Sequence, residues 1–465
     1  MSFPKYPEYK DSGVEWLGEV PAHWQVKRMR FVATLNPSKS EVRHWPDTAE
    51  VSFIPMEAVG EDGSLDLTQT RPLGEVVGGY TYLSEGDVTF AKITPCFENG
   101  KGAIMQGLCE GVGFGTTELT VARPDTSQVT GGYLYRVISS RPFRELGESH
   151  MYGAGGQKRV PDDFLRNFEL AWPPVPEQTS IAAFLDHETA RIDSLVEEQQ
   201  RLIELLKEKR QAVISHVVTK GLAPDVPLKD SGVEWLGEVP EHWEVMRVKH
   251  AAKLESGHTP NKEKAEYWDG GIPWVSLNDS KELARSDYID ETKFSISCLG
   301  VSNSSARLLP PRTVVFTRDA TIGVSAITTK EMAVSQHLIA WVCREDAVIS
   351  EYLLLVFYAM KEELDRYTFG ATIKTIGMPD VRSLSMPLPP LPEQKEVVDY
   401  VLAERDRLDG LIAEAQKASR LLVERRSALI SAAVTGKIDV RGWQTDQQAD
   451  QSEMLMAAEA RATYG

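Results

Sequence analysis

The chain contains the stretch KDSGVEWLGEVP twice, at residues 10–21 and at residues 229–240. A second repeated pair begins with PPVPEQ at residues 173–178 and with PPLPEQ at residues 389–394. The two pairs are displaced by 219 and 216 residues, a period much longer than that of a solenoid repeat. The chain is therefore two tandem copies of one unit.

Between these repeated flanks the two copies differ. Segment 36–150 and segment 255–368 share only short patches, although the flanks beside them include twelve identical residues. A duplication that had simply drifted would have diverged in the flanks as well. We therefore expect the flanks to do the same work twice and the two middle segments to do different work.

Each PPxPEQ motif begins a stretch of about 40 residues with apolar residues every three or four positions, as in a long helix. Gly221 and Gly436 stand near the two ends. At ~1.5 Å per residue each helix would span roughly 60 Å. The narrow stripes favour antiparallel pairing of the two helices, with a globular domain at each end, although packing of each helix on its own domain remains an alternative. The stripe residues are Ile181, Leu185, Ile192, Leu195, Leu202, Leu206 and Val213, and then Val397, Val401, Leu408, Leu411, Ala418, Leu422 and Leu429.

The middle segments alternate short apolar runs with Gly, Pro and Asp, which is typical of short strands. The predicted fold class is α/β (α+β): two globular domains separated by a pair of long antiparallel coiled-coil helices, in a pseudo-two-fold repeat. The expected segments are an N-terminal globular domain (1–175), a long helix (176–222), a C-terminal globular domain (223–391), a second long helix (392–440) and a polar, poorly ordered tail (441–465).

Composition limits the class of protein. Of the 465 residues, 42% are hydrophobic and 26% are charged, as in a globular protein. No signal peptide or membrane-spanning run is visible, and the four cysteines lie far apart, so we expect reduced thiols and a cytoplasmic protein. The formal charge of −17 by itself counts against DNA binding, although a basic face can lie on an acidic body.

The order GVEWLGEVPxHWxVxR, a variable domain, PPxPEQ and a long helix ending in RxxxIS…VTxG resembles the specificity subunits of Type I restriction–modification systems, the HsdS family. Both copies show this order, so the resemblance covers about residues 1–440. ITPCFENGKGA with GFGTTELTVARP is similar to one recurrent type of target-recognition domain, and SGHTPNKEKAEYWDGGIPWVS is similar to another.

The resemblance implies a non-catalytic subunit. Each recognition domain would read one half of a split site in double-stranded DNA. The partners implied are two modification subunits, which methylate adenine, and two restriction subunits, which cleave DNA. The chain itself would need no cofactor or metal, since S-adenosylmethionine, ATP and Mg would bind to the partner subunits. No membrane is implied as a partner.

Candidate DNA contacts are polar and cationic residues of the middle segments and the loops after them, because such side chains contact phosphates and base edges. Some of these candidates lie in a Gly/Pro-interrupted loop that follows a predicted strand. Others form a basic run shortly before the PPxPEQ motif. Trp274, Asn278 and Asp279 belong to the second domain's own signature, and Trp274 is also a candidate for the core. The candidates are Lys92, Thr94, Asn99, Lys101, Gln157, Lys158, Arg159, Trp274, Asn278, Asp279, Arg318, Asp319, Thr321 and Lys374.

Two other classes of protein remain as alternatives. The first is a stand-alone DNA methyltransferase or nuclease, because Pro379-Asp380 followed by Glu393-Gln394-Lys395 superficially fits a PD…ExK signature. The first copy lacks the lysine, and PPxPEQ is more simply a helix start. The second class is a coiled-coil scaffold without DNA binding, which would leave the two dissimilar middle segments unexplained. His23 and His242 have no neighbouring metal-ligand pattern, so we expect them to be structural.

Overall fold

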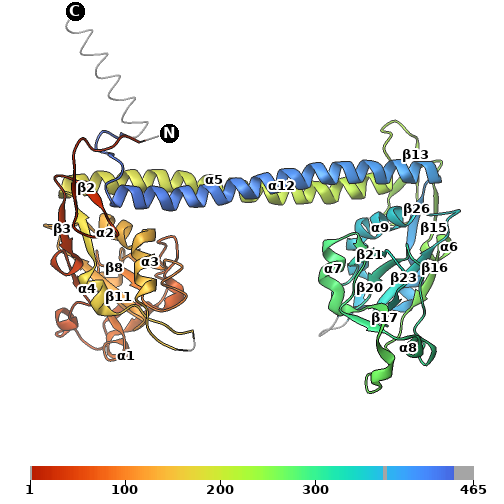
Figure 1. The fold of residues 1–465 in the computed structure, drawn as a ribbon, viewed down its shortest axis with the longest axis horizontal. Coiled ribbons are helices and arrows are strands. Elements are labelled where there is room, and N and C mark those ends of the chain that lie inside the picture. The colour runs from red at the N-terminus through yellow and green to blue at the C-terminus, as the bar shows by residue number, and fades with distance from the viewer. Residues whose placement is uncertain (1–2, 155, 370–373, 445–465) are drawn as a thin grey trace, which may run out of the picture. The chain divides into compact units, whose positions relative to one another are not determined.

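The computed structural model describes residues 3–154, 156–369 and 374–444. Two compact units are present: unit 1 contains residues 1–198 and 418–465, and unit 2 contains residues 199–417. Two long helices, α5 (Val175–Lys220) and α12 (Leu391–Val434), each contribute one end to each unit (Figure 1). Each unit therefore combines a mixed α/β body with a short helix pair.

Ion pairs join the two long helices in both units. In unit 1, Asp193 of α5 pairs with Arg426 of α12 at 2.8 Å, and in unit 2, Arg210 of α5 pairs with Asp409 of α12 at 2.7 Å. The residue number rises along α5 while it falls along α12, so the two helices run antiparallel. The predicted antiparallel helix pair is confirmed.

The predicted apolar stripe was wrong at three positions. Leu195, Leu202 and Leu411 were expected at the seam between the helices, but they are 38%, 43% and 39% exposed. The buried cluster on this part of the pair instead contains Ile203 and Ile412, with Ala415 and Leu206 against them. A helix of 3.6 residues per turn drifts away from a strict heptad repeat over this length, so neighbouring positions take over the seam.

Unit 1 has a body of two four-stranded sheets and two small antiparallel pairs. One sheet has the order β6-β5-β10-β7, the other β4-β11-β8-β9, and the pairs are β1-β2 and β12-β3. The strands are β1 (Tyr9–Asp11), β2 (Glu19–Pro21), β3 (Gln25–Arg28), β4 (Ala33–Leu35), β5 (Glu50–Ile54), β6 (Thr70–Pro72), β7 (Thr81–Ser84), β8 (Val88–Ala91), β9 (Gly102–Ile104), β10 (Val112–Gly115), β11 (Leu119–Pro124) and β12 (Glu169–Trp172). The short helices are α1 (Leu73–Val76), α2 (Gly131–Ile138), α3 (Arg141–Ser149) and α4 (Asp162–Asn167).

Unit 2 has a five-stranded sheet of order β16-β23-β20-β21-β18, a three-stranded sheet of order β19-β17-β22, and the pairs β13-β14, β15-β26 and β24-β25. The strands are β13 (Leu228–Asp230), β14 (Glu238–Pro240), β15 (Glu244–Arg247), β16 (Ala252–Ser256), β17 (Trp268–Val275), β18 (Tyr288–Ile289), β19 (Phe294–Ile296), β20 (Val314–Thr317), β21 (Ser325–Thr328), β22 (Ala333–Val334), β23 (Leu338–Cys343), β24 (Thr368–Phe369), β25 (Thr375–Ile376) and β26 (Ser385–Leu388). The short helices are α6 (Val248–Ala251), α7 (Ser280–Arg285), α8 (Cys298–Ser302), α9 (Ser350–Ala359), α10 (Lys361–Arg366) and α11 (Met378–Ser383).

The apolar core of each unit joins the body to the ends of both long helices. In unit 1 the largest cluster includes Trp24 and Phe143 from the body together with Phe184 of α5 and Ile430 of α12. In unit 2 an equivalent cluster includes Trp341 of β23 with residues of α5, α9 and α12. The long helices are thus part of both cores and not separate rods.

The expected disordered tail was partly wrong. Trp443 packs edge-on against Phe184 with ring centroids 5.5 Å apart, and Arg441 pairs with Asp439 at 2.6 Å. The first residues of the tail are therefore held on unit 1, because they supply apolar surface and a local ion pair. Residues 445–465 lie outside the described residues.

A search of the described helices for a stretch long and apolar enough to cross a bilayer finds none.

Candidate nucleic-acid interface

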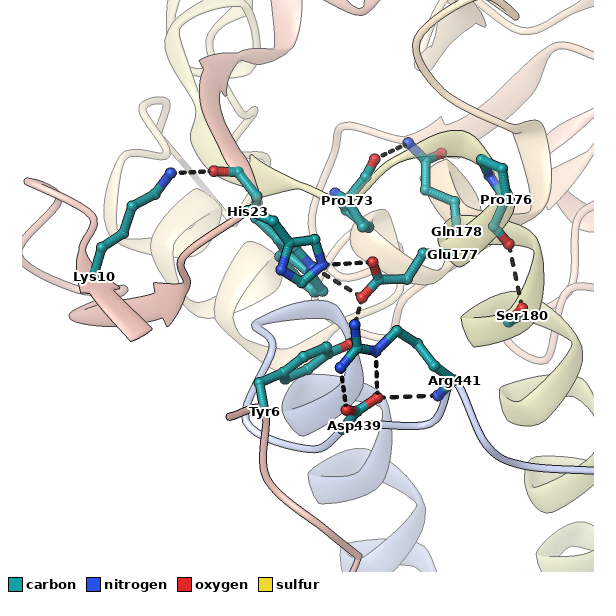
Figure 2. Close-up of polar contacts among 11 residues, drawn as sticks. Tyr6, Lys10, His23, Pro173, Pro176, Glu177, Gln178, Ser180, Asp439 and Arg441 are labelled. Carbon is teal, nitrogen blue, oxygen red and sulfur yellow. Dashed lines mark hydrogen bonds and ion pairs between the residues drawn. The ribbon is translucent and has the colours of Figure 1, made fainter. Parts of the chain in front are cut away.

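The glutamate of each PEQ motif anchors the preceding repeated flank to the start of a long helix. Figure 2 shows Glu177 in unit 1, whose carboxylate accepts from the Tyr6 hydroxyl at 2.7 Å and from the Trp24 indole N–H at 3.0 Å. His23 Nε2 lies 2.7 Å from its second oxygen. Burial, together with the neighbouring carboxylate, raises the pKa of Tyr6. The hydroxyl therefore stays protonated and can donate.

Unit 2 repeats the indole and imidazole contacts of this junction. Glu393 accepts from the Trp243 indole N–H at 3.0 Å, and His242 Nε2 lies 2.9 Å from its other oxygen. The side chain of Glu393 is therefore engaged in a structural contact, which argues against the nuclease reading of Asp380 with Glu393. His23 and His242 take the structural role expected for them.

The glutamine of each PEQ motif fixes a loop of the body to the same helix start. Both glutamine side chains are fully buried. Gln178 accepts from the backbone N–H of Thr130 at 2.9 Å, and Gln394 accepts from that of Ile349 at 3.0 Å. The two repeated motifs thus build the same scaffold in both units, so sequence-specific function has to come from other surfaces.

In unit 1 two candidate loops meet beside the sheet that contains β8 and β11. The backbone N–H of Val160 donates to the C=O of Lys92 at 2.9 Å, and that of Thr94 donates to the C=O of Lys158 at 3.0 Å. The N–H of Lys92 in turn donates to the C=O of Glu118 at 2.9 Å. Three segments far apart in sequence are therefore held side by side.

Unit 2 contains the same three backbone bonds. Ile376 donates to Arg318 at 2.9 Å, Ala320 donates to Lys374 at 2.8 Å, and Arg318 donates to His337 at 2.9 Å. By these bonds, Lys92 after β8 corresponds to Arg318 after β20, and Glu118 before β11 corresponds to His337 before β23. We call this set of three backbone hydrogen bonds the loop frame, and each unit contains one.

The shared frame places cations at equivalent positions. Lys92 is equivalent to Arg318, and Lys158 is equivalent to Lys374. Lys158 and Lys374 are exposed, and the other two are half-buried. Among the described residues, the ion pairs of these loops involve Arg159 and Arg318 but none of the three lysines. The lysines can therefore neutralise an external anion such as a phosphate.

The other candidates of unit 1 are close to this frame but are engaged differently. Asn99 Nδ2 donates to Glu61 at 2.9 Å, and Lys101 Nζ donates to the C=O of Met56 at 3.2 Å. The hydroxyl of Thr94 donates to the C=O of Gly156 at 2.7 Å, which secures the adjoining loop. Gln157 is exposed in that loop.

Arg159 is bound by the protein itself. Its guanidinium donates two bonds to Glu118, at 2.8 and 2.6 Å. Hydrogen bonding to Arg159 holds the pKa of Glu118 below its ordinary value. The ion pair holds the side chains of Arg159 and Glu118 beside the loop frame. The charge of Arg159 is therefore already balanced within the protein.

Two candidates of unit 2 have buried side chains, which argues against direct contact with DNA. Trp274 is 5% exposed and its indole N–H donates to the C=O of His258 at 3.1 Å. Asp279 is 6% exposed and accepts from the backbone N–H groups of Ser276 at 2.8 Å and Lys293 at 2.7 Å. Both side chains hold the second domain together.

The remaining candidates of unit 2 stay predictions. Asn278 and Thr321 are exposed. Asp319 is half-buried and lies 2.7 Å from His337 Nδ1, so its carboxylate orients a neighbour and is not presented to solvent. Arg318 Nε lies 3.7 Å from Asp319 in an ion pair, and it is buried without a hydrogen-bond partner among the described residues.

Sequence reasoning missed the residues at the starts of β11 and β23. Thr117 and Glu118 in unit 1, and Gln336 and His337 in unit 2, stand directly before these strands at equivalent positions. Thr117 and Gln336 are both exposed. Aligning GTTELTVARP with VSQHLIAWVC by their strands would have found these positions, because both copies can be compared within the one chain.

Residues 240–410 match the family model described as the Type I restriction modification DNA specificity domain. Over 189 residues the chain is 43% identical to the Type I restriction enzyme EcoEI specificity subunit of Escherichia coli, which covers 40% of this chain and 31% of that protein. It is 21% identical to the putative MjaX specificity subunit of Methanocaldococcus jannaschii, over 95% of this chain and 99% of that protein.

Most of the chain is similar to Type I specificity subunits, and residues 240–410 match their DNA specificity domain. The fold of this chain is also found in solved structures. A solved structure that concerns complex assembly and conformational transition of the type I R-M system aligns with a TM-score of 0.70 at 17% identity, covering 89% of this chain and 98% of that one. The HsdS subunit from Thermoanaerobacter tengcongensis aligns with a TM-score of 0.58 at 17% identity, covering 90% and 98%. The predicted combination of mixed α/β domains and paired long helices agrees with the fold of these two structures. The match spans about a third of the length of the EcoEI and EcoAI subunits.

Proposed function

We propose that this chain is the DNA-sequence-recognition subunit of a Type I restriction–modification complex. Each unit reads one half of a bipartite site in double-stranded DNA. Two modification subunits methylate adenine at that site, and two restriction subunits cleave DNA. S-adenosylmethionine, ATP and Mg act on those partner subunits, and this chain supplies sequence recognition without catalysis.

The observation that carries the proposal is one backbone frame with different side chains. The three bonds that hold the loops in unit 1 recur in unit 2 within 0.2 Å. The positions next to the frame carry Glu118 and Arg159 in one unit and His337 and Thr375 in the other. A scaffold that offers two different polar surfaces from one geometry fits a protein that reads two different half-sites.

The equivalent cations explain how an acidic protein can bind DNA. Lys92 and Lys158 in unit 1 correspond to Arg318 and Lys374 in unit 2. Phosphate contacts supply affinity without reading sequence, so they need not differ between the two half-sites. The formal charge of −17 is a sum over the whole chain, so it does not describe the charge at these positions. Few local cations and an acidic body predict weak non-specific binding by the chain alone.

Exposed leucines on the long helices support the binding of two copies of one partner. Leu195 lies two residues after Asp193, and Leu411 lies two residues after the equivalent Asp409. They are 38% and 39% exposed. Large apolar side chains repeated on a protein surface are typical of contacts with other proteins.

A second pair of leucines has the same relation to the helix ion pairs. Leu205 and Leu421 each lie five residues before the arginine that joins the two helices, and they are 52% and 54% exposed. Each unit therefore presents one leucine from α5 and one from α12. This repetition suits one modification subunit for each unit.

The test is to express this chain with its modification subunit and to sequence the methylated adenines in the cellular DNA. We expect a bipartite motif whose methylation depends on both proteins. Methylation or cleavage of DNA by the purified chain alone, abolished by a point substitution within it, would overturn the proposal in favour of a stand-alone enzyme. Full assembly of the complex without any sequence preference would favour the scaffold alternative.

A further inference from the structure

The residues directly before β11 and β23 face the same frame in both units but differ in chemistry. The C=O groups of Glu118 and His337 accept equivalent backbone bonds from Lys92 and Arg318, both at 2.9 Å. The cations at the frame are retained between the units, whereas a carboxylate in unit 1 is replaced by an imidazole in unit 2. Positions that keep their place and change their chemistry are expected to read sequence.

In unit 2 these residues form a polar chain that begins at a half-buried carboxylate. Asp319 has a side chain that is 15% exposed, and it lies 2.7 Å from Nδ1 of His337. The hydroxyl of Thr375 donates to the other oxygen of Asp319. A carboxylate can only accept, so Nδ1 of His337 carries the proton and the ring is fixed in one tautomer.

The chain continues to the exposed amide of Gln336. Nε2 of the Gln336 amide lies 3.3 Å from Nε2 of His337, which is the acceptor nitrogen in this tautomer. The hydroxyl of Thr259 donates to the Gln336 oxygen. The amide is therefore held at both ends, and its orientation is determined by these contacts.

These contacts leave half of the amide's hydrogen-bonding capacity free. A glutamine amide has two N–H donors and two lone pairs on its oxygen. His337 takes one donor and Thr259 uses one lone pair. Beyond these two contacts, the amide of the exposed Gln336 has one further donor and one further acceptor, which is the pattern that pairs with N7 and N6 of adenine in the major groove.

We propose that Gln336 is a base-reading residue of unit 2 that binds the major-groove edge of an adenine, and that His337 and Asp319 are its positioning residues. The inference rests on the proposed function, since it assigns one base contact within one half-site. Gln336 Oε1 accepts from the adenine amino group and Nε2 donates to adenine N7. Arg318 and Lys374 on the neighbouring loops bind the DNA backbone beside it.

Unit 1 has no equivalent amide. Thr117 occupies the position of Gln336, and its shorter side chain has only a hydroxyl. Glu118 occupies the position of His337 and is engaged by Arg159. The two half-sites are therefore expected to differ at the base pair that this position contacts.

The test uses the full chain assembled with its modification subunits and a library of DNA sites randomised in both halves. For Gln336→Ala we expect the preference for adenine over other bases to fall about tenfold to a hundredfold at one position of one half-site. The other half-site is an internal control and should keep its full preference. Asp319→Asn should reduce the same preference partially, because the amide can donate to His337 Nδ1 and favour the other tautomer.

Lys374→Ala is the matched control, because this exposed lysine lies on the adjoining loop. It should weaken binding to all sequences alike and lower the salt dependence by the equivalent of about one phosphate contact. A Gln336→Ala complex that binds all sequences more weakly, that loses preference in both halves, or that keeps its original preference would overturn the inference. If the unsubstituted complex shows no bipartite preference, the proposed function fails instead.

Discussion

Units 1 and 2 are built on the same attachments but differ at their polar surfaces. A buried glutamine fixes a loop of the body in each unit, and a glutamate receives an indole N–H at 3.0 Å in each. The residues next to the loop frame, in contrast, form an ion pair in unit 1 and a histidine–carboxylate contact in unit 2. The two units therefore share the contacts that attach the body to the long helices. They differ in the side chains at the surface that is proposed to read the DNA sequence.

The strongest way to break this comparison is to exchange one recognition segment. Replacing residues 36–160 by the matching segment of a related specificity subunit should change one half of the methylated motif completely. The other half should be unaffected, because unit 2 and the helix ends keep their own residues. The measurement is sequencing of methylated adenines. A swap that assembles and alters both halves would show that readout is not divided between the units.

Removing the junction glutamates should have the next largest effect. Glu177→Ala leaves Tyr6 and the fully buried Trp24 indole N–H without an acceptor, which should cost unit 1 about 2–4 kcal/mol of unfolding free energy. Glu393→Ala should cost unit 2 about 1–2 kcal/mol, because the side chain of Glu393 is 26% exposed and water can replace part of its contacts.

Hydrogen exchange of the full chain separates the two junction effects. Glu177→Ala should increase exchange around residues 3–28 and 173–185, whereas Glu393→Ala should increase it around residues 221–247 and 389–401. Equal protection losses in both units from either substitution would show that the two junctions are not independent.

Much of this scaffold could be predicted from the sequence, because each repeated motif is a local signal seen twice. Pro176 and Pro392 marked the starts of the long helices, and Gly221 adopts a φ of +75° directly after α5. The seam was harder to predict. Leu202 and Ile203 are adjacent and equally apolar, and only the packed partner helix decides which one is buried.

The polar surface was less predictable, because a polar residue in a loop has several possible partners. Asp279 was a reasonable candidate for DNA contact until its carboxylate was found to accept two backbone N–H groups. Gln336 was missed because nothing local distinguishes it from a solvated loop residue. Its significance depends on His337 and Asp319, and Asp319 is 17 residues away in sequence.

A third prediction concerns the cations that both units retain. Substituting Lys92 and Lys158 by Ala together should lower the slope of log affinity against log salt concentration by about 1.8, since each phosphate contact contributes ~0.9. The base preferences of both half-sites should be unchanged. Competition binding by the assembled complex at several salt concentrations measures both quantities. A changed base preference would mean that these lysines read bases and do not only anchor the backbone.

The smallest expected effect comes from a contact that the units make with different chemistry. Arg136 of α2 donates to Asp186 of α5 in unit 1, with Nε at 3.1 Å. The equivalent positions in unit 2 are Leu355 and Leu402, which belong to its apolar core.

Replacing Arg136 and Asp186 by leucine, as in unit 2, tests whether this ion pair contributes to the stability of unit 1. The side chain of Arg136 is 11% exposed and that of Asp186 is 66% exposed, so solvent screens the pair. The double substitution Arg136→Leu/Asp186→Leu should change the free energy of unfolding by less than about 1 kcal/mol, because two apolar side chains replace both partners. Asp186→Leu alone should be worse than the double substitution, since it leaves the mostly buried guanidinium of Arg136 without its carboxylate. Denaturant unfolding of the three variants gives the coupling directly. A double substitution that costs more than the single one would show that unit 1 requires the ion pair, and that the two bodies differ in more than their recognition surfaces.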